Sequence, residues 1–293
     1  MTTAARPRRS ALYMPGANPR ALEKAKTLAA DSVIFDLEDA VAPEAKAEAR
    51  ETVANAVKAG GYGQREVVVR INGLDTEWGL DDMAAAVAAG PDALLAPKVI
   101  DGGDIDRLSD AMTRAGAPDT MDLWVMIEMP KAILNIQDIA EAVGRTRLSA
   151  FVMGTNDLAK ELRAKPTADR AAFQTSLGLA VTAARAYDLV AIDGVFNAIG
   201  DDDGLAFECE QGRNLGFDGK TLIHPSQLDA CNRIFSPEPA DVAHAHAVIA
   251  AFAEPENAGK GVIKVDGKMT ELLHLEEAKR LVSVQAAIDA MAG

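Results

Sequence analysis

The 293-residue sequence has few cysteines, few aromatic residues and no long hydrophobic run. Its two cysteines, Cys209 and Cys231, form neither a C-x-x-C pair nor a disulfide framework, and no apolar signal segment opens the chain. We therefore expect a cytoplasmic protein, because both features are typical of a reducing compartment. No stretch of about 18 apolar residues could span a membrane, so no membrane partner is expected. Because aromatic residues make up only 4% of the chain, the core should consist of Ala, Val, Ile and Leu.

Positive charge is also scarce. The chain has 30 lysines and arginines against 44 aspartates and glutamates, for a formal net charge of -14. Nucleic-acid binding needs a basic face over much of its footprint, so a nucleic-acid partner is not expected. The basic opening MTTAARPRRS raises the alternative of a transit peptide. Since it is short and passes directly into a strand-like run, we favour a disordered start with a functional basic end.

Apolar runs bounded by turn residues alternate with longer amphipathic segments. Eight runs are candidate strands, over residues 10–14, 32–37, 67–71, 93–99, 123–128, 150–153, 190–193 and 221–223. The candidate helices lie over residues 19–30, 43–59, 77–89, 104–115, 131–143, 168–187, 202–215 and 225–234. This repeated alternation is typical of a (β/α)8 TIM barrel, and a doubly wound open sheet is the weaker alternative. The sequence therefore predicts an α/β TIM barrel over residues 1–235.

The composition changes at Ser236-Pro237-Glu238-Pro239, where two prolines in four positions predict a linker. Beyond it, the sequence predicts a helix over 240–253, a hairpin over 262–269 around Asp266-Gly267, and a helix over 272–291. The segment 236–293 is too short for a strong core of its own. We therefore expect this C-terminal segment to pack on the barrel or on a neighbouring subunit.

Two carboxylates follow two of the predicted strands. Glu128 ends the run WVMIE, and Asp157 follows the Gly-Thr-Asn turn after AFVM. If these strands are neighbours in a barrel, their carboxyl ends lie on the face where TIM barrels place their active sites. Hard oxygen ligands without a nearby histidine or cysteine favour Mg²⁺ over zinc. The alternative for Asp157 is a capping role at a helix that starts near Leu158, but the strand-end positions favour a metal site.

Charged residues also end two earlier strands. Asp36 and Glu38 are two residues apart and should share a strand face, with Asp39 at the turn. Carboxylates this close repel one another unless a cation, a water network or a base shares the site. Arg70 ends the run VVVR, where it either pairs with one of these carboxylates or binds an anionic substrate group. The two roles can coexist.

A local basic patch surrounds the Gly16-Ala17-Asn18 turn before a predicted helix. A phosphate-bearing ligand could bind at the amino end of that helix. The basic residues of this part of the chain are Arg8, Arg9, Arg20, Lys24 and Lys26.

Motifs over most of residues 8–227 occur in the order of a known family. They are RRSALYMPGANPRALEKA, VIFDLEDAV, VVVRING, LLAPKV, WVMIEMPKAI, GTNDLAKEL, AIDGVF and FDGKTLIHPSQ. With them, the chain resembles the citrate lyase β-subunit-like enzymes, which include malyl-CoA and citramalyl-CoA lyases. The segment GVIKVDGKMTELLHLEEAKRL resembles the C-terminal lid of that family.

The resemblance implies a Mg²⁺-dependent carbon–carbon lyase. Such an enzyme cleaves or forms a 3-hydroxyacyl-CoA, for example citramalyl-CoA or malyl-CoA, with acetyl-CoA and a 2-oxo acid (pyruvate or glyoxylate) as the other species. By this resemblance Glu128 and Asp157 hold Mg²⁺, and Arg70 binds and polarises the acceptor carbonyl or carboxylate. Family members assemble as homo-oligomers, so we expect a trimer or hexamer in which one subunit's lid closes another's site.

The resemblance also assigns roles to the remaining candidates. The Asp36, Glu38 and Asp39 cluster would position waters at the metal. The phosphates of the coenzyme A thioester would meet the basic N-terminal stretch, with Arg9, Arg20 and Lys24 as the best candidates.

One position departs from the lyases. In the alignment of GKMTE with the lid, Glu271 stands where the lyases carry an aspartate that is associated with removal of the acetyl-CoA α proton. An additional methylene disturbs a proton transfer that depends on close geometry. Attack of water on the thioester would instead release free CoA, so a malyl-CoA-type thioesterase is one alternative. A citrate lyase β-like subunit that needs partner chains is the other.

Overall fold

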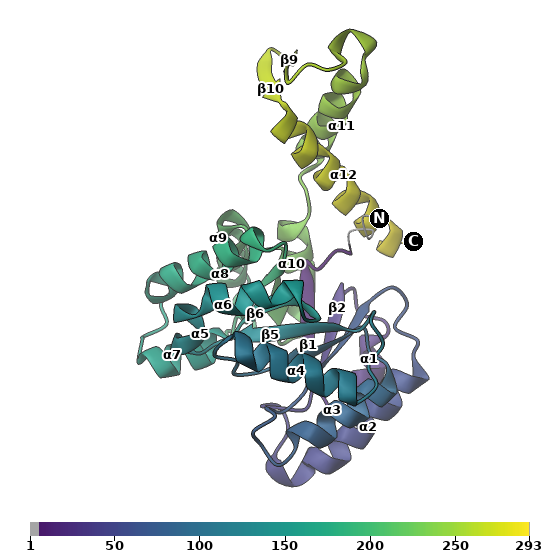
Figure 1. Ribbon diagram of the computed structural model, residues 1–293, viewed down its shortest axis with the longest axis vertical. Coiled ribbons are helices and arrows are strands. Elements are labelled where there is room, and N and C mark those ends of the chain that lie inside the picture. Colours follow the sequence, from purple (N-terminus) through teal and green to yellow (C-terminus); the bar gives the residue numbers. More distant parts are fainter. Residues whose placement is uncertain (1–5, 293) are drawn as a thin grey trace. The chain divides into compact units, whose positions relative to one another are not determined.

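The computed structural model describes residues 6–292 (Figure 1). The disordered start expected from the sequence falls largely on residues 1–5, outside the described residues. The chain divides into two compact units. One contains Arg8–Phe235, and the other contains the residues from Ser236 onward.

The unit Arg8–Phe235 is a closed barrel of eight parallel strands. β1 pairs with β2 on one side and with β8 on the other, which closes the sheet. The predicted TIM barrel is therefore confirmed, and each predicted strand is present with its ends shifted by a few residues at most. The strands are β1 (Ser10–Pro15), β2 (Ser32–Asp36), β3 (Glu66–Arg70), β4 (Ala93–Ala96), β5 (Asp122–Ile127), β6 (Leu148–Met153), β7 (Val190–Asp193) and β8 (Gly219–Leu222).

Helices cover the outside of the barrel (Figure 1). They are α1 (Pro19–Ala25), α2 (Lys46–Ala59), α3 (Gly79–Ala89), α4 (Gly102–Arg114), α5 (Pro130–Leu134), α6 (Ile136–Glu141), α7 (Thr155–Leu162), α8 (Gln174–Ala186), α9 (Asp202–Leu215) and α10 (Leu228–Phe235). Short 3-10 turns at Pro43–Ala45, Ala171–Phe173 and Pro225–Gln227 lead into α2, α8 and α10. The single helix predicted over 131–143 is instead broken at Asn135, whose backbone (φ -106°, ψ 17°) is not helical.

Alternating side chains along each strand build two apolar layers, as expected for residues that point to opposite faces. The layer inside the barrel contains Ile34, Val68, Leu95, Met126 and Val152, closed below by the fully buried Trp124. The other layer lies between the strands and the helices and is made mainly of Val, Ile, Leu and Ala. The aliphatic core predicted from the composition is therefore confirmed.

The residues from Ser236 onward form a helical pair with a hairpin between its helices. The elements are α11 (Pro239–Ala253), a 3-10 turn at Pro255–Asn257, β9 (Val262–Val265), β10 (Lys268–Glu271) and α12 (Leu272–Ala292). β9 and β10 pair antiparallel, and Asp266 and Gly267 between them both have positive φ (49° and 80°). Such angles are those of the Asp-Gly turn that the sequence predicted. Ala245, Val248 and Ile263 belong to a small core of this unit.

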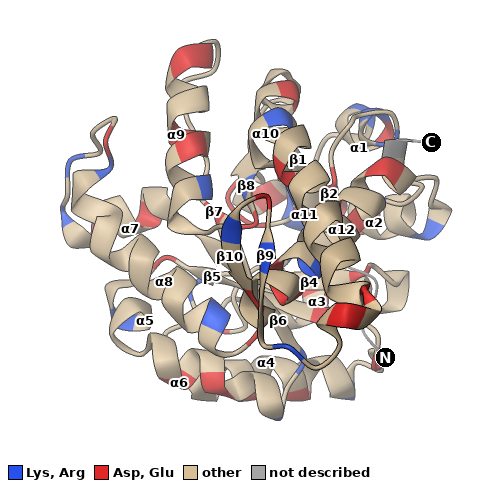
Figure 2. Ribbon diagram, turned by 90° about the horizontal axis from the view of Figure 1, so that it is seen from above, with Lys and Arg blue, Asp and Glu red and all other residues tan. Residues whose placement is uncertain are grey.

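Charged positions are spread over the helices rather than gathered in one basic face. Figure 2 shows acidic positions on many helices, several of them on α9, with basic positions between them. Within residues 6–292, no helix has both the length and the apolar character needed to cross a membrane.

Candidate active site

The carboxyl ends of four neighbouring strands bring charged side chains together. Asp36 ends β2, Arg70 ends β3, Lys98 follows β4, and Glu128 directly follows β5. The parallel register places Asp36 opposite Arg70. Asp157 follows β6, the strand next to β5 in the barrel, and lies in the first turn of α7.

Arg70 is held by carboxylates on two sides. Its Nε and Nη2 donate to the two carboxylate oxygens of Asp36 at 2.7 and 2.6 Å, a bidentate pair. Its Nη1 lies 2.9 Å from Oε2 of Glu38 and 3.5 Å from the mostly exposed Asp39. The ion-pair role predicted for Arg70 is thus confirmed. Its role toward a substrate stays a prediction.

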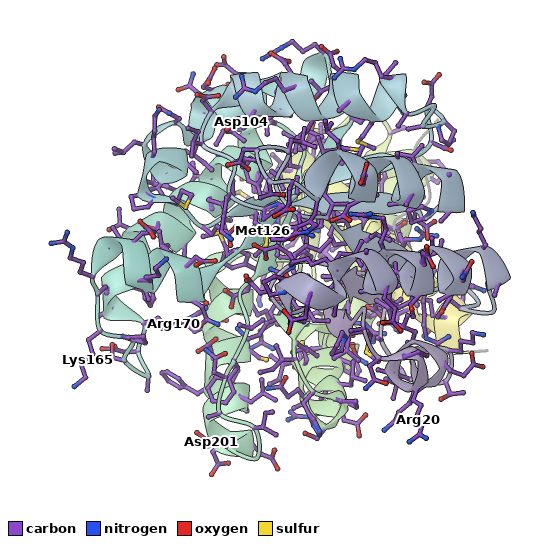
Figure 3. All side chains as sticks on the ribbon, turned by 90° about the horizontal axis from the view of Figure 1, so that it is seen from below. Arg20, Asp104, Met126, Lys165, Arg170 and Asp201 are labelled. Carbon is purple, nitrogen blue, oxygen red and sulfur yellow. The ribbon has the colours of Figure 1, made fainter. Side chains whose placement is uncertain are left out.

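Tyr13 and Met126 also contact the guanidinium group of Arg70. The guanidinium carbon lies 4.9 Å from the centroid of the Tyr13 ring, a cation–π contact, and Nη1 lies 3.5 Å from Sδ of Met126. Figure 3 shows Met126 near the middle of the barrel unit. Burial, with the neighbouring carboxylates, raises the pKa of Tyr13 above its usual value, while the charge of Arg70 opposes that shift. The Tyr13 ring and the Met126 sulfur thus hold Arg70 in place together with the carboxylates.

The loop after β2 differs from the sequence prediction. Asp36 and Glu38 do not share a strand face, because β2 ends at Asp36 and Glu38 lies in the following loop. The carboxylate of Asp36 accepts the main-chain N–H groups of Glu38 and Ala40, at 2.9 and 3.1 Å, which turns the chain. The prediction of one face was therefore wrong, although both carboxylates reach Arg70.

Lys98 was not singled out from the sequence, yet it contacts both Glu38, which pairs with Arg70, and Glu128. Its ammonium donates to Oε1 of Glu38, and its main-chain N–H donates to Oε1 of Glu128 at 2.8 Å. Burial raises the pKa of Glu38, while Arg70 and Lys98 oppose that shift. In the sequence, the usable signal was a lysine inside the predicted strand over 93–99, which lies between the strands that carry Arg70 and Glu128.

Glu128 is almost fully buried and held from two sides. Besides the N–H of Lys98, it packs against Gly154, where an added Cβ would collide with Cβ and Oε2 of Glu128. Burial raises the pKa of Glu128 to about 8. The N–H of Lys98 opposes this shift, and the charges of Asp157 and Glu38 add to it. The negative charges of Asp157 and Glu38 near Glu128 are not fully compensated, so a cation bound here would be stabilising.

Asp157 is half-buried and belongs to a helix that begins earlier than expected. α7 starts at Thr155, so the Gly-Thr-Asn segment is not a turn before a helix near Leu158. The cap position is Gly154, and no side chain makes a capping hydrogen bond there. The capping alternative for Asp157 is therefore wrong.

The donor set fits a magnesium ion better than an ion enclosed by protein ligands. Within the described residues, no group of three or more histidine, cysteine, aspartate or glutamate side chains is arranged to hold a metal. Mg²⁺ commonly binds proteins through one or two carboxylates and completes its shell with water or substrate oxygens. The pair Glu128 and Asp157, one buried and one half-buried, meets that requirement.

The basic residues expected to meet CoA separate into two groups. Arg20 and Lys24 are exposed on α1, which follows the carboxyl end of β1, and Figure 3 shows Arg20 at the edge of the barrel unit. Arg9 precedes β1 at the opposite, amino end of the strand, where its guanidinium donates to both oxygens of Asp31 at 2.9 and 2.8 Å. The prediction for Arg9 is corrected accordingly, and Arg9 is not carried into the proposed CoA contacts.

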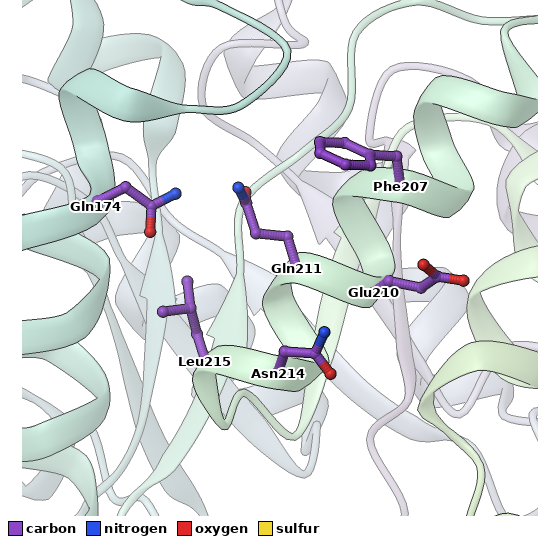
Figure 4. Close-up of a pocket in the computed structure, with 6 residues that line it drawn as sticks. All are labelled: Gln174, Phe207, Glu210, Gln211, Asn214 and Leu215. Carbon is purple, nitrogen blue, oxygen red and sulfur yellow. The ribbon is translucent and has the colours of Figure 1, made fainter.

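Two further features are a predicted residue of the C-terminal unit and a cavity of the barrel unit. Glu271 ends β10 in the C-terminal unit, where its main-chain N–H donates to Nδ1 of His274 at 2.9 Å. A cavity of about 310 Å³ lies between α8 and α9 (Figure 4). Its lining residues are Gln174, Phe207, Glu210, Gln211, Asn214 and Leu215. None of these is a residue that the sequence predicted for the site.

A parallel barrel that gathers buried carboxylates and an arginine at the carboxyl ends of its strands has the architecture of a barrel enzyme. The family model described as HpcH/HpaI aldolase/citrate lyase matches residues 9–225. The chain belongs to this family, as its motifs indicated.

Curated relatives match nearly the whole chain. The (3S)-malyl-CoA thioesterase of Cereibacter sphaeroides (strain ATCC 17025 / ATH 2.4.3) is 49% identical over 290 residues, 99% of each chain. The citrate lyase subunit beta of Leuconostoc mesenteroides subsp. cremoris is 34% identical over 285 residues, 96% of this chain and 94% of the relative.

A solved structure also matches over nearly its full length. It is the CitE protein of Mycobacterium tuberculosis in complex with magnesium, acetoacetate and coenzyme A. The match has a TM-score of 0.75 and 26% identity, and it covers 98% of this chain and 99% of the other.

Proposed function

We propose that the protein hydrolyses a 3-hydroxyacyl-CoA thioester of the malyl-CoA type in a Mg²⁺-dependent reaction. The observation that carries this proposal is the 49% identity, over 99% of both chains, with a (3S)-malyl-CoA thioesterase. Identity with a citrate lyase β subunit is lower, at 34%. Glu271 supports the same choice, because it replaces the lid aspartate that the resemblance associates with the lyase reaction.

Each candidate residue has a part in this proposal. Glu128 and Asp157 would hold Mg²⁺, which when bound supplies positive charge that polarises the substrate carbonyl. Arg70, held in place by Asp36, presents a fixed positive charge to an anionic oxygen of the substrate. Arg20 and Lys24, exposed on α1, are the proposed contacts for the CoA phosphates.

The hydrolytic step needs a water molecule and a base. Water adds to the thioester carbonyl carbon, the C–S bond breaks, and the departing sulfur takes up a proton. The products are a free 3-hydroxy acid and CoA. We assign removal of the water proton to Glu271, whose carboxylate belongs to the lid segment and acts in the barrel of the same subunit or a neighbouring one.

A carbon–carbon lyase is the second candidate. It is favoured by the citrate lyase β relatives and by the CitE structure, which holds magnesium, acetoacetate and coenzyme A. The lyase would convert malyl-CoA or citramalyl-CoA into acetyl-CoA plus glyoxylate or pyruvate. In a partner-dependent β subunit, the isolated chain would be inactive until its partner chains were added.

Product analysis separates these candidates. Purified protein with Mg²⁺ and malyl-CoA is expected to release free CoA and intact malate. A thiol assay measures the CoA, and chromatography identifies the malate. Acetyl-CoA and glyoxylate would establish the lyase instead. No turnover of malyl-CoA or citramalyl-CoA would contradict both proposals for the isolated chain.

The metal assignment has its own test. Asp157→Asn should abolish activity while circular dichroism shows an intact fold, because the substitution removes one proposed Mg²⁺ ligand. The matched control is Glu161→Gln, an exposed carboxylate on the same helix, which should keep wild-type activity. Retained activity in Asp157→Asn would remove Asp157 from the metal site.

A further inference from the structure

Lys98 joins the arginine half of the site to the metal half. Its ammonium contacts Glu38, which also contacts Arg70, and its main-chain N–H contacts Glu128. The loop residue therefore contacts the loop after β2 through its side chain and the residue that follows β5 through its main chain. A substitution of its side chain removes only the contact with Glu38 and leaves the N–H in place.

The backbone of Lys98 is held in a conformation that lysine rarely adopts. Its φ is 55°, in the left-handed region, where a residue other than glycine is strained. Such strain persists only where surrounding contacts fix it, and the hydrogen bond to buried Glu128 is one of them. The conformation directs the N–H toward Glu128 while the side chain reaches Glu38.

The charges around Glu38 show what the ammonium contributes. Asp36 already occupies Nε and Nη2 of Arg70, and Nη1 faces Oε2 of Glu38. The other oxygen of Glu38 is occupied by Lys98. Without the ammonium, Glu38 would have Arg70 as its remaining cationic contact among these groups. The positive charge of Arg70 would then be neutralised more completely by the protein itself.

The contact is more than a solvated surface ion pair. The Lys98 side chain is 48% exposed, but that of Glu38 is only 9% exposed. An exposed pair contributes little because water screens it, whereas a pair with one buried partner is screened less. The buried end of the pair is the end that faces Arg70.

We propose that Lys98 is a positioning residue of this active site. Its ammonium holds Glu38 so that Arg70 keeps positive charge for an anionic substrate oxygen, while its main-chain N–H orients Glu128. The inference rests on the proposed function, because it assigns Arg70 to the substrate.

The test compares Lys98→Met, which keeps the length and removes the charge, with Lys98→Arg, which keeps the charge. The control is Lys160→Met, an exposed lysine paired with Glu161 on α7. The measurements are KM and kcat with malyl-CoA, the Mg²⁺ affinity by calorimetry, the affinity of the Mg²⁺-loaded protein for malate, and the melting temperature.

For Lys98→Met, kcat/KM should fall at least about ten-fold, with KM rising, because Arg70 binds the anion less well. Malate affinity should fall in parallel. Mg²⁺ affinity should be unchanged or higher, since Glu128 keeps its N–H donor and the site gains negative charge. Lys98→Arg should recover most of the loss, and Lys160→Met should match the wild type.

Three results would overturn the proposal. They are a Lys98→Met protein with wild-type kcat/KM, one whose Mg²⁺ affinity falls as far as its activity, and a folded Lys98→Arg protein as defective as Lys98→Met. If the wild type turned over no acyl-CoA, the proposed function would fail, and the malate affinities would then decide the role of Lys98. Absence of malate binding by the wild type as well would overturn both.

Discussion

Glu128 leaves no room for a methyl group at Gly154. The main-chain N–H of Lys98 fixes one oxygen of this carboxylate, and the other packs against the glycine. Because Gly154 has an ordinary negative φ of -100°, an alanine would be acceptable to the backbone. The close approach of Glu128 is therefore what requires glycine here.

We predict that Gly154→Ala impairs Mg²⁺ binding far more than it impairs folding. The new methyl group must displace Glu128, and about 1 Å of misplacement can cost on the order of 10²-fold in activity. Mg²⁺ affinity by calorimetry and thermal melting measure the two effects. Gly178→Ala on α8 is the control, because a Cβ there meets no atom within 4 Å. Wild-type Mg²⁺ affinity in Gly154→Ala would contradict the assignment of Glu128 to the metal.

Some of these residues were accessible from the sequence and others were not. Asp36, Arg70 and Glu128 interrupt apolar runs, and such interruptions predict a site at strand ends. Lys98 interrupts the apolar run over 93–99 but was not singled out, and Gly154 carries no such signal, because a glycine before a helix is common. Their importance comes from contacts with residues about 30 positions away.

The ends of β7 and β8 carry a second group of buried charges, outside the active site. Asp193 is fully buried and accepts from Nη1 of Arg170 at 2.7 Å and from Nζ of Lys220 at 3.2 Å. Lys220 is also fully buried and donates to Glu208 on α9 at 2.6 Å. These contacts join the barrel wall to α9. Removal of one partner would leave an uncompensated buried charge.

Asp193→Asn is predicted to lower the free energy of unfolding at neutral pH by about 3 kcal/mol or more, because Lys220 and Arg170 lose their buried counter-charge. Chemical denaturation measures the loss. The double variant Asp193→Asn/Lys220→Met removes both charges and should recover part of it. A single variant as stable as the wild type would show that the pair does not join these elements.

The same cluster predicts how stability depends on pH. Burial alone would raise the pKa of Asp193, but Lys220 and Arg170 hold the pKa below its ordinary value. A carboxylate whose pKa is lowered in the folded state stabilises the fold above its unfolded pKa of about 3.9 and loses that effect at lower pH. The stability gap between wild type and Asp193→Asn should therefore be constant near neutrality and narrow as the pH falls below about 4. A gap independent of pH in denaturation curves would argue against this.

At the scale of elements, the sequence predicts strands better than helices. Each strand is a short apolar run between turn residues, so its position is marked on both sides. The helix predicted over 131–143 contains no proline or glycine that would announce the break at Asn135. α7 likewise begins earlier than its apolar pattern indicates, because Gly154 and not a polar capping side chain precedes it.

At the scale of the whole molecule, the proposed oligomer can be tested through the lid. Glu271→Ala and Arg70→Ala subunits should each be inactive, since each lacks one proposed active-site group. If the lid acts on a neighbouring subunit, mixed oligomers contain some sites with both groups, and part of the activity returns. The measurement is thioester hydrolysis before and after subunit exchange.

Two controls accompany this experiment. Mixing each inactive variant with itself should restore nothing, and light scattering should show that the mixed species is an oligomer. A lid that acts within its own subunit would give no recovery in the mixture. In that case the trans arrangement would be excluded while the hydrolytic role of Glu271 remained.

The barrel was predictable because the strand–helix unit occurs eight times in the sequence. The family was predictable because many motifs occur in the family's order. The reaction was not, because the proposed choice between hydrolysis and carbon–carbon cleavage turns on one methylene at Glu271. Local sequence patterns do not show how far the Glu271 carboxylate reaches. The identity with a malyl-CoA thioesterase therefore supplies the argument for hydrolysis that the sequence pattern alone did not provide.

The closure of the barrel has a further consequence for self-association. Because β1 pairs with β8, the barrel strands leave no unpaired edge on which another chain could add a strand. The β9–β10 hairpin is an isolated two-stranded sheet and keeps its outer edges. It carries Lys264, Lys268 and Glu271, and charged side chains on an edge oppose strand addition. Aggregation through strands is thus opposed by closure in the barrel and by charge in the hairpin.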